Sequence, residues 1–387
     1  MKKRLVRSIP TIQSELSLCG PKDSFVESLD INIGLIKNRI TSKNLKINSH
    51  HIGRYCDTSI SVLYIDGIVK EDLIIHIMER LQKIDIDGII DSSYLKQYLE
   101  NHFHLFPTII MSERPDMSCM SLLEGKAVIL VDNSPYALIL PNFFVDFFHT
   151  TDDYYQKPFN TSFIRFIRLF AFIISIFTPA FYICITTRNY HLIPFNLLLI
   201  LKAGRSFVPF PAYLEAIFMI ICFEILKESD LRMSTTSGSS ISILGGLILG
   251  DAAVAAGIVS PIMIIVIAIS SISGLIFTSF ELENALRMYK IVFLILSSLF
   301  GLYGMIYGIF MMLYDLYDTK IFGYPYFSIK QLFMKDSFIR TSSNLLKRNP
   351  VLSNNFVRGR IQKWKRLFYI LLVLLYYVFY QINLIKN

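Results

Sequence analysis

Long apolar stretches with few charges dominate the chain from residue 169 onward. Residues 169–187 and 291–313 contain 19 and 23 residues without a charge, and residues 241–279 contain 39 residues with one charge. A helix that spans a bilayer needs about 20 predominantly apolar residues. The first two stretches therefore predict one crossing each. The third has room for two crossings or for one and a half-helix, and residues 209–226 predict a weaker crossing because they contain two glutamates.

The number of membrane crossings must agree with the side of the membrane on which the two ends of the predicted membrane region lie. Residues 314–366 contain 11 Lys and Arg against 3 Asp and Glu, and cytoplasmic flanks of membrane spans are rich in basic residues. No apolar signal-peptide run follows the first lysines, so we expect residues 1–160 in the cytoplasm as well. An even number of crossings is then required, and one of the five candidates should be incomplete. The segment around Gly257, Ser260 and Pro261 is the best suspect, because non-helical backbone is tolerated where protein covers it.

The pattern changes in residues 1–160, which predict an α/β domain. Residues 60–65 are β-branched and aromatic and end in a turn, and residues 69–84 follow with apolar positions at helical spacing. Residues 127–131 and 136–140 are short apolar strands joined by Asp, Asn, Ser and Pro, which predicts a hairpin.

We therefore predict a polytopic α-helical membrane protein with an N-terminal cytoplasmic α/β domain. Residues 1–160 form that domain, and residues 161–313 form a membrane domain of about four full spans plus a partial or re-entrant segment. A basic cytoplasmic tail of residues 314–366 follows. The last segment, 367–387, is hydrophobic and predicts an extra span, with an interfacial helix as the alternative.

The composition supports a membrane protein and argues against nucleic acid as a partner. The 387 residues are 53% hydrophobic and only 18% charged, with a net charge of +8. The first 160 residues carry −3, residues 161–313 carry +2 and the remainder carries +9. The basic excess is therefore one C-terminal feature near predicted spans, where it sets orientation.

Three carboxylates in the apolar stretches are candidates for an ion path. Charges inside a membrane are costly and mark a pathway or a partner. Asp251 and Glu215 are the stronger candidates, because Glu224 lies three residues from Lys227 and could form a surface ion pair with it. Lys202 and Arg205 are interpreted as anchors at the headgroup level.

Small residues beside Asp251 repeat at a spacing that allows helices to approach closely. They either pack helices within one subunit or let several copies of a helix surround a narrow pore. A second pair is Gly304 and Gly308. The residues of the main ladder are Ser242, Gly246, Gly250, Ala253 and Gly257.

The other polar motifs favour a structural role over a catalytic or binding role. Glu113, Arg114 and Asp116 combine opposite charges around a proline, which could fix a loop or present Arg114 to a partner. The chain lacks a Walker loop and the GxSxG and HExxH motifs, so we expect that the protein is not an enzyme. Scattered cysteines and histidines provide no metal-ligand spacing, so we expect no metal and no cofactor.

Six segments together resemble the GerA family, the A subunits of spore germinant receptors, over roughly residues 10 to 350. They are SERPD (112–116), LLEGKAVILVDNSPYALILP (122–141), DDYY (152–155), VPFPAYLEAIFM (208–219), ISILGGLILGDAAVAAGIVSP (241–261) and FGYPY (322–326). Relative to that family, the chain begins near the expected start of a second N-terminal subdomain. Ala255 replaces a residue that is more often polar.

The resemblance implies a multi-pass protein of the spore inner membrane, in contact with membrane lipid. It implies a transporter-like B subunit and a lipoprotein C subunit as partners, and a homo-oligomer that releases cations when nutrient is sensed. Two alternatives stay open. One is a membrane scaffold of the germination complex that conducts nothing, and the other is a relative of the SpoVAF branch, which is linked to dipicolinate release.

Overall fold

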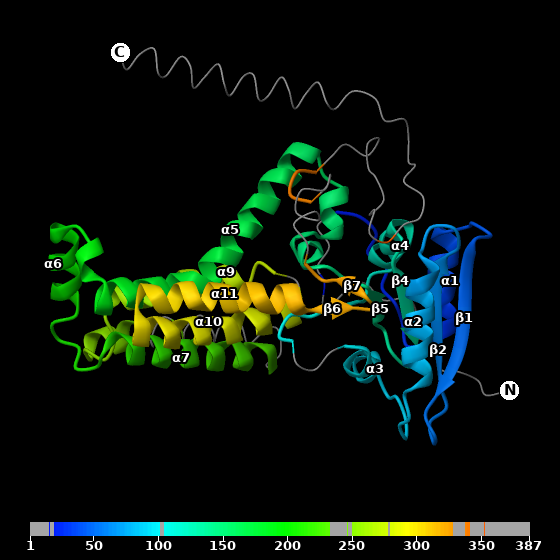
Figure 1. Cartoon of the computed structure of the whole chain (residues 1–387), viewed down its shortest axis with the longest axis horizontal. Coiled ribbons are helices and arrows are strands. Elements are labelled where there is room, and N and C mark those ends of the chain that lie inside the picture. The colour runs from blue at the N-terminus through cyan, green and yellow to red at the C-terminus, as the bar shows by residue number, and fades with distance from the viewer. Residues whose placement is uncertain are drawn as a thin grey trace, which may run out of the picture.

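The structure, a computed structural model, describes residues 15, 19–100, 104–232, 246, 250–277, 279–327, 337–340 and 352. Figure 1 shows a sheet with its helices at one end of the molecule and a bundle of long helices that extends away from it. The sheet domain is built from the first part of the chain, as the sequence predicts, and the helices follow.

Five strands form one antiparallel sheet in the order β1-β2-β4-β5-β3. In β4 and β5 the register pairs Ala127 with Leu140, so the predicted hairpin is confirmed. Its turn contains Asn133 with a φ of 67°, a left-handed conformation that Asn tolerates better than most residues. The strands are β1 (Leu45–Ile52), β2 (Thr58–Ile65), β3 (Ile110–Ser112), β4 (Ala127–Val131) and β5 (Ala137–Leu140).

Helices cover both faces of the sheet, because successive side chains of a strand point to opposite faces. Val128 and Leu130 of β4 join the hydrophobic cluster of α1 (Leu29–Arg39) and α4 (Pro115–Glu124). The alternate β4 residues Ala127, Ile129 and Val131 join the cluster of α2 (Glu71–Gln82) and α3 (Ser92–Leu99). A strand buried on both faces reads as a continuous apolar run, which is what residues 127–131 are.

The helical bundle begins with α5 (Pro158–Ile183), which continues through a π-helical turn, Cys184–Arg188. α5 packs against α9 and α10, α7 packs against α9, and α10 packs against α11. The remaining helices are α6 (Phe195–Gly204), α7 (Ala212–Arg232), α9 (Pro261–Gly274), α10 (Phe280–Phe300) and α11 (Leu302–Asp318).

The predicted single crossing at residues 291–313 is wrong. The chain turns at Gly301, whose φ is 61°, and the stretch divides between α10 and α11, which pack against each other. Hydropathy counts apolar residues and does not register such a turn. A Cβ atom at Gly304 would lie 2.0 Å from the backbone oxygen of Leu296, so the two helices approach at a distance that only glycine allows.

The helix is also broken near the segment predicted to be incomplete. Gly257 has a φ of 66°, and α9 begins only at Pro261 and has 14 residues. In the described part of the chain, one helix is long and apolar enough to cross a membrane, Pro158–Arg188, and α6 and α9 are shorter apolar helices. The number of crossings therefore stays a prediction.

The region after residue 313 starts inside α11, which ends at Asp318, so the predicted boundary cuts a helix. Two short strands follow, β6 (Lys320–Ile321) and β7 (Tyr324–Pro325), and Ile321 is buried in the cluster of α2 and α3. The start of the predicted tail thus packs onto the sheet domain. Most of the basic segment and all of residues 367–387 lie outside the described residues.

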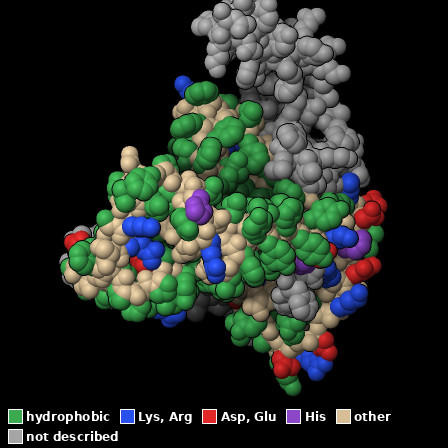
Figure 2. All heavy atoms as spheres, turned by 60° about the vertical axis from the view of Figure 1, so that its left-hand side comes forward, with side chains coloured by type: hydrophobic (Ala, Val, Ile, Leu, Met, Phe, Trp, Pro, Cys, Tyr) green, Lys and Arg blue, Asp and Glu red, His purple; other side chains and the backbone are tan. Residues whose placement is uncertain are grey.

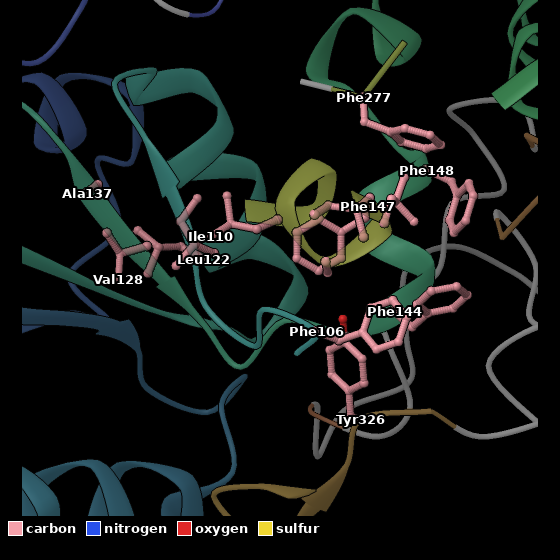
Figure 3. Packing of buried hydrophobic residues seen from close by; sticks show 14 of the residues in the cluster. Phe106, Ile110, Leu122, Val128, Ala137, Phe144, Phe147, Phe148, Phe277 and Tyr326 are labelled. Carbon is pink, nitrogen blue, oxygen red and sulfur yellow. The ribbon is translucent and has the colours of Figure 1, made fainter. Parts of the chain in front are cut away.

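An aromatic core joins the sheet domain to the bundle (Figure 3). Phe106 stacks on Tyr289 of α10 with ring centroids 5.1 Å apart. Phe144 meets Phe172 of α5 edge to face at 5.5 Å, and Phe148 contacts the Phe277 ring at 5.8 Å. Such pairs add about 0.5–1.5 kcal/mol each beyond the area they bury, so the two parts share one continuous core.

Candidate functional site

The 112–116 motif folds into a buried ion-pair cluster at the start of α4. The Arg114 guanidinium donates to both Asp116 carboxylate oxygens, at 3.1 and 2.8 Å, and to Asp152 at 3.2 Å. The Tyr155 hydroxyl donates to Asp116 at 2.9 Å. Arg114 is 3% exposed, so it holds DDYY against the motif, and its side chain is not presented at the surface. Glu113 accepts a hydrogen bond from the Glu15 backbone N–H at 3.1 Å.

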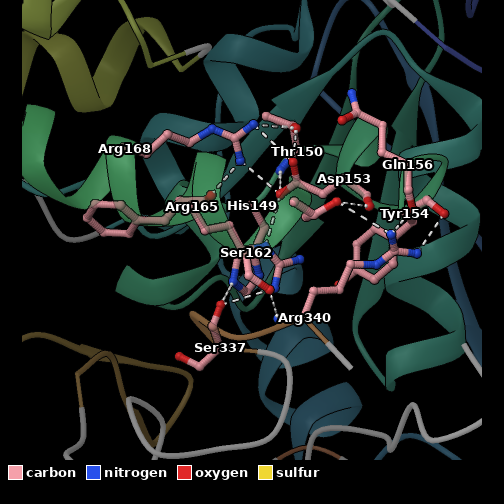
Figure 4. A network of polar contacts seen from close by, with 12 residues as sticks. His149, Thr150, Asp153, Tyr154, Gln156, Ser162, Arg165, Arg168, Ser337 and Arg340 are labelled. Atoms are coloured by element: carbon pink, nitrogen blue, oxygen red, sulfur yellow. Dashed lines mark hydrogen bonds and ion pairs between the residues drawn. The ribbon is translucent and has the colours of Figure 1, made fainter. Parts of the chain in front are cut away.

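A second network ties the first turns of α5 to the segment before it (Figure 4). Asp153 accepts from Arg165 Nε at 3.1 Å and from Arg168 at 2.8 and 3.0 Å. Arg165 is fully buried and also donates to the Ser337 carbonyl at 3.1 Å. Arg340 donates to the Tyr154 carbonyl at 2.9 Å. The sequence patterns considered above did not indicate this network. A signal was present in the arginines three residues apart in α5's first turns.

His149 lies inside this network without a carboxylate partner in the described contacts. Its Nε2 hydrogen bonds with the Ser337 carbonyl. Burial and the Arg165 charge hold the pKa of His149 well below its ordinary value, so the ring is neutral at physiological pH.

Polar pairs also link the sheet domain to α10 and α11. Lys96 of α3 is 3% exposed and forms an ion pair with Glu281 of α10. His104 Nδ1 lies 2.8 Å from Asp315 of α11, and the same carboxylate accepts a hydrogen bond from Tyr289 of α10. Together with the aromatic core, these contacts give the domain three attachment points on the bundle, at α5, α10 and α11.

Glu215 is not an unpaired carboxylate. It is 2% exposed and accepts from Arg205 at 2.9 Å and from the Ser260 backbone N–H at 3.0 Å. Ser260 is the N-cap of α9, where a negative charge is stabilised by the unsatisfied N–H groups of the helix end. Arg205 is therefore the partner of Glu215, which replaces its interpretation as a headgroup anchor.

Glu224 forms an ion pair with Arg287 of α10 at 2.9 Å, and Lys227 pairs with Glu283 of α10. The predicted pair between Glu224 and Lys227 on one helix is corrected to two pairs across α7 and α10. Side chains on neighbouring helices compete with same-helix partners, and the sequence does not record which helices touch.

Asp251 differs from the two glutamates, because its side chain is exposed. Of the small residues beside it, a Cβ at Gly246 or Gly250 would meet none of the described residues within 4 Å, whereas Ala253 is buried and a Cβ at Gly257 would lie 3.0 Å from the Phe207 carbonyl oxygen. Ser242 lies outside the described residues.

Similarity to known proteins places the chain in a family. The sequence profile described as Bacillus/Clostridium GerA spore germination protein matches residues 1–352. The chain belongs to the GerA family. The prediction from the sequence motifs is thereby confirmed. Spore germination protein KA of Bacillus subtilis (strain 168) is 41% identical over 83% of this GerA-family chain and 59% of its own length. Spore germination protein GerQA of Bacillus cereus is 35% identical over 93% of the chain and 73% of its own length.

This chain is also similar to a solved structure. The crystal structure of the N-terminal domain of the A subunit of the Bacillus megaterium spore germinant receptor GerK3 is 38% identical, covering 31% of this chain and 97% of that one, with a TM-score of 0.27. The relatives are longer than the matched part, since the chain spans about three fifths of the length of protein KA. No group of three or more metal-ligating side chains occurs among the residues that the structure describes.

Proposed function

We propose that this GerA-family chain acts as the A subunit of a nutrient-gated germinant receptor in the spore inner membrane. The observation that carries the proposal is the family match over residues 1–352, together with relatives named as spore germination proteins. The subunit works with a transporter-like B subunit and a lipoprotein C subunit, and it assembles as a homo-oligomer.

The surface of the bundle supports a place in the membrane. Figure 2 shows hydrophobic side chains spread over the helical end of the molecule. Large rings of α11 are exposed, including Tyr303 at 81% and Phe310 at 66%. An exposed apolar surface of this extent marks a protein or membrane interface. The relative YfkQ of Bacillus subtilis (strain 168) is named a membrane protein. We place the bundle in lipid as a multi-pass domain with the sheet domain in the cytoplasm.

The ion-conducting role rests on one carboxylate of the three. Glu215 and Glu224 each have an arginine partner, so their charges are balanced within the subunit. Asp251 is exposed, and a Cβ at the neighbouring Gly250 would meet none of the described residues within 4 Å. In an oligomer, that helix face could line a path, and a ring of carboxylates favours cations.

A scaffold that conducts nothing is the second candidate. The arginine partners of Glu215 and Glu224 favour it, because a paired carboxylate holds helices together and is poorly suited to bind a passing ion. Nothing in the geometry favours the SpoVAF-like alternative over either.

Co-expression in vegetative cells tests the proposal. The chain is produced with its B and C partners, and membrane potential is recorded as nutrient is added. We expect depolarisation that needs both nutrient and this chain. A complex that assembles without any nutrient-dependent cation leak contradicts conduction and favours the scaffold, and failure to assemble with B and C contradicts the subunit assignment itself.

A further inference from the structure

A cavity of about 90 Å³ with a largely apolar wall and several charged side chains lies between α5, α7, α9 and α10. Its polar lining consists of Ser175 of α5, Ser271 of α9 and five charged side chains of α7 and α10. The charged side chains are Glu224, Lys227, Glu283, Arg287 and Lys290. We call it the Lys290 cavity.

The charges of the cavity do not balance. Glu224 pairs with Arg287 and Glu283 pairs with Lys227, which uses both carboxylates and two of the three cations. Lys290 remains, so the five side chains carry one net positive charge.

Lys290 is 6% exposed. No hydrogen bond or ion pair reaches its ammonium from the part of the chain that the structure describes. Glu224 attracts it, whereas Arg287 and Lys227 repel it. A buried charge is costly unless it is paired. The site therefore lacks one negative charge.

We propose that the Lys290 cavity binds a small monovalent anion, such as chloride, formate or acetate. The anion would lie against the Lys290 ammonium, and the hydroxyls of Ser175 and Ser271 are available as donors at the cavity wall. Its occupancy would fix α7 against α10 next to the two interhelical ion pairs.

The volume limits the ligand. An apolar cavity of about 150 Å³ accommodates benzene, so about 90 Å³ admits an anion of roughly four heavy atoms or fewer. Benzoate should be excluded. Glu224 and Arg287 are each about one-third exposed, at 33% and 30%, which gives the anion an entry between α7 and α10.

The test measures anion binding to the full chain in detergent micelles. Chloride NMR line broadening is titrated and then competed with acetate, formate or benzoate. Lys290→Gln removes the charge, Lys290→Arg keeps it, and Lys202→Gln on α6 is the control because Lys202 is exposed.

We expect saturable chloride broadening in the wild type that acetate and formate reverse and benzoate does not. Lys290→Gln should weaken chloride binding about tenfold or more, since charge-assisted hydrogen bonds contribute about 1.5–3 kcal/mol. Lys290→Arg and Lys202→Gln should retain it. Even if Lys290→Gln misfolds, the chloride titration and the competition experiments on the wild type test the proposal. Absence of saturable broadening, equal competition by benzoate, or undiminished binding in a folded Lys290→Gln variant would overturn the proposal.

Discussion

Charged side chains serve different ends in two regions of the bundle. Where α5 meets the sheet domain, Asp153 is held by two arginines, and Arg165 is fully buried. Around residue 251, by contrast, Asp251 is exposed, and a Cβ at Gly250 would meet no atom of the described residues within 4 Å. The junction has the features of a rigid attachment. At Asp251, the part of the chain that the structure describes shows no such set of ion pairs, which is what the proposed ion path requires.

The largest effect is expected at Arg165. Arg165→Ala should lower the free energy of unfolding by about 3–5 kcal/mol, because it leaves a buried carboxylate with fewer partners. Chemical denaturation in detergent measures it. Arg232→Ala is the control, since Arg232 is exposed. Equal stability of both variants would show that the junction is not the anchor.

The next effect concerns the turn between α10 and α11. Gly304→Ala places a methyl group 2.0 Å from the Leu296 carbonyl oxygen, so the helices must separate. We expect a loss of about 1–3 kcal/mol in thermal or chemical unfolding. Gly34→Ala in α1 is matched to it, because no atom of the described part of the chain lies within 4 Å of that Cβ, and it should be neutral or slightly stabilising. A Gly304→Ala variant with an unchanged free energy of unfolding would contradict the close packing of α10 against α11.

The coupling of Lys96 to Glu281 tests whether the sheet domain and α10 act as one unit. A double-mutant cycle of Lys96→Met and Glu281→Gln should give an interaction energy of about 0.5–3 kcal/mol in equilibrium unfolding. An interaction energy of zero would mean that the ion pair contributes nothing to the attachment.

Acidification by one pH unit should weaken the junction between α5 and the sheet domain by a smaller amount. The pKa of His149 is lowered in the folded chain by burial and by Arg165, so below about pH 6.5 the unfolded chain binds the extra proton and stability falls. The loss should approach about 1.4 kcal/mol per pH unit below that pH, and this contribution should be absent in His149→Gln. A His149→Gln variant with an unchanged pH profile would assign the dependence to other groups.

The sequence predicted local features well. The strands around the Asp, Asn, Ser and Pro turn and the helix near residues 71–82 follow from short-range patterns, and both are present. β1 was missed because five of its eight residues are polar, so it contains neither an apolar run nor a regular apolar and polar alternation.

Long-range pairing was beyond the sequence. The Glu215 contact to Arg205 and the N–H of Ser260 joins three elements, and no periodicity within one helix indicates it. The turn at Gly301 was hidden for a related reason. Apolar residues continue on both sides of the glycine, so the hydropathy of residues 291–313 resembles that of one straight helix.

Asp251 gives the most direct test of the proposed ion path, with nutrient-evoked cation release as the measurement. Asp251→Ala and Asp230→Ala both remove an exposed carboxylate, and each should change the free energy of unfolding by less than about 0.5 kcal/mol. In co-expressing cells with intact assembly, we predict that Asp251→Ala removes most of the nutrient-evoked release and Asp230→Ala leaves it unchanged. Full release in an assembled Asp251→Ala complex would contradict the ion path.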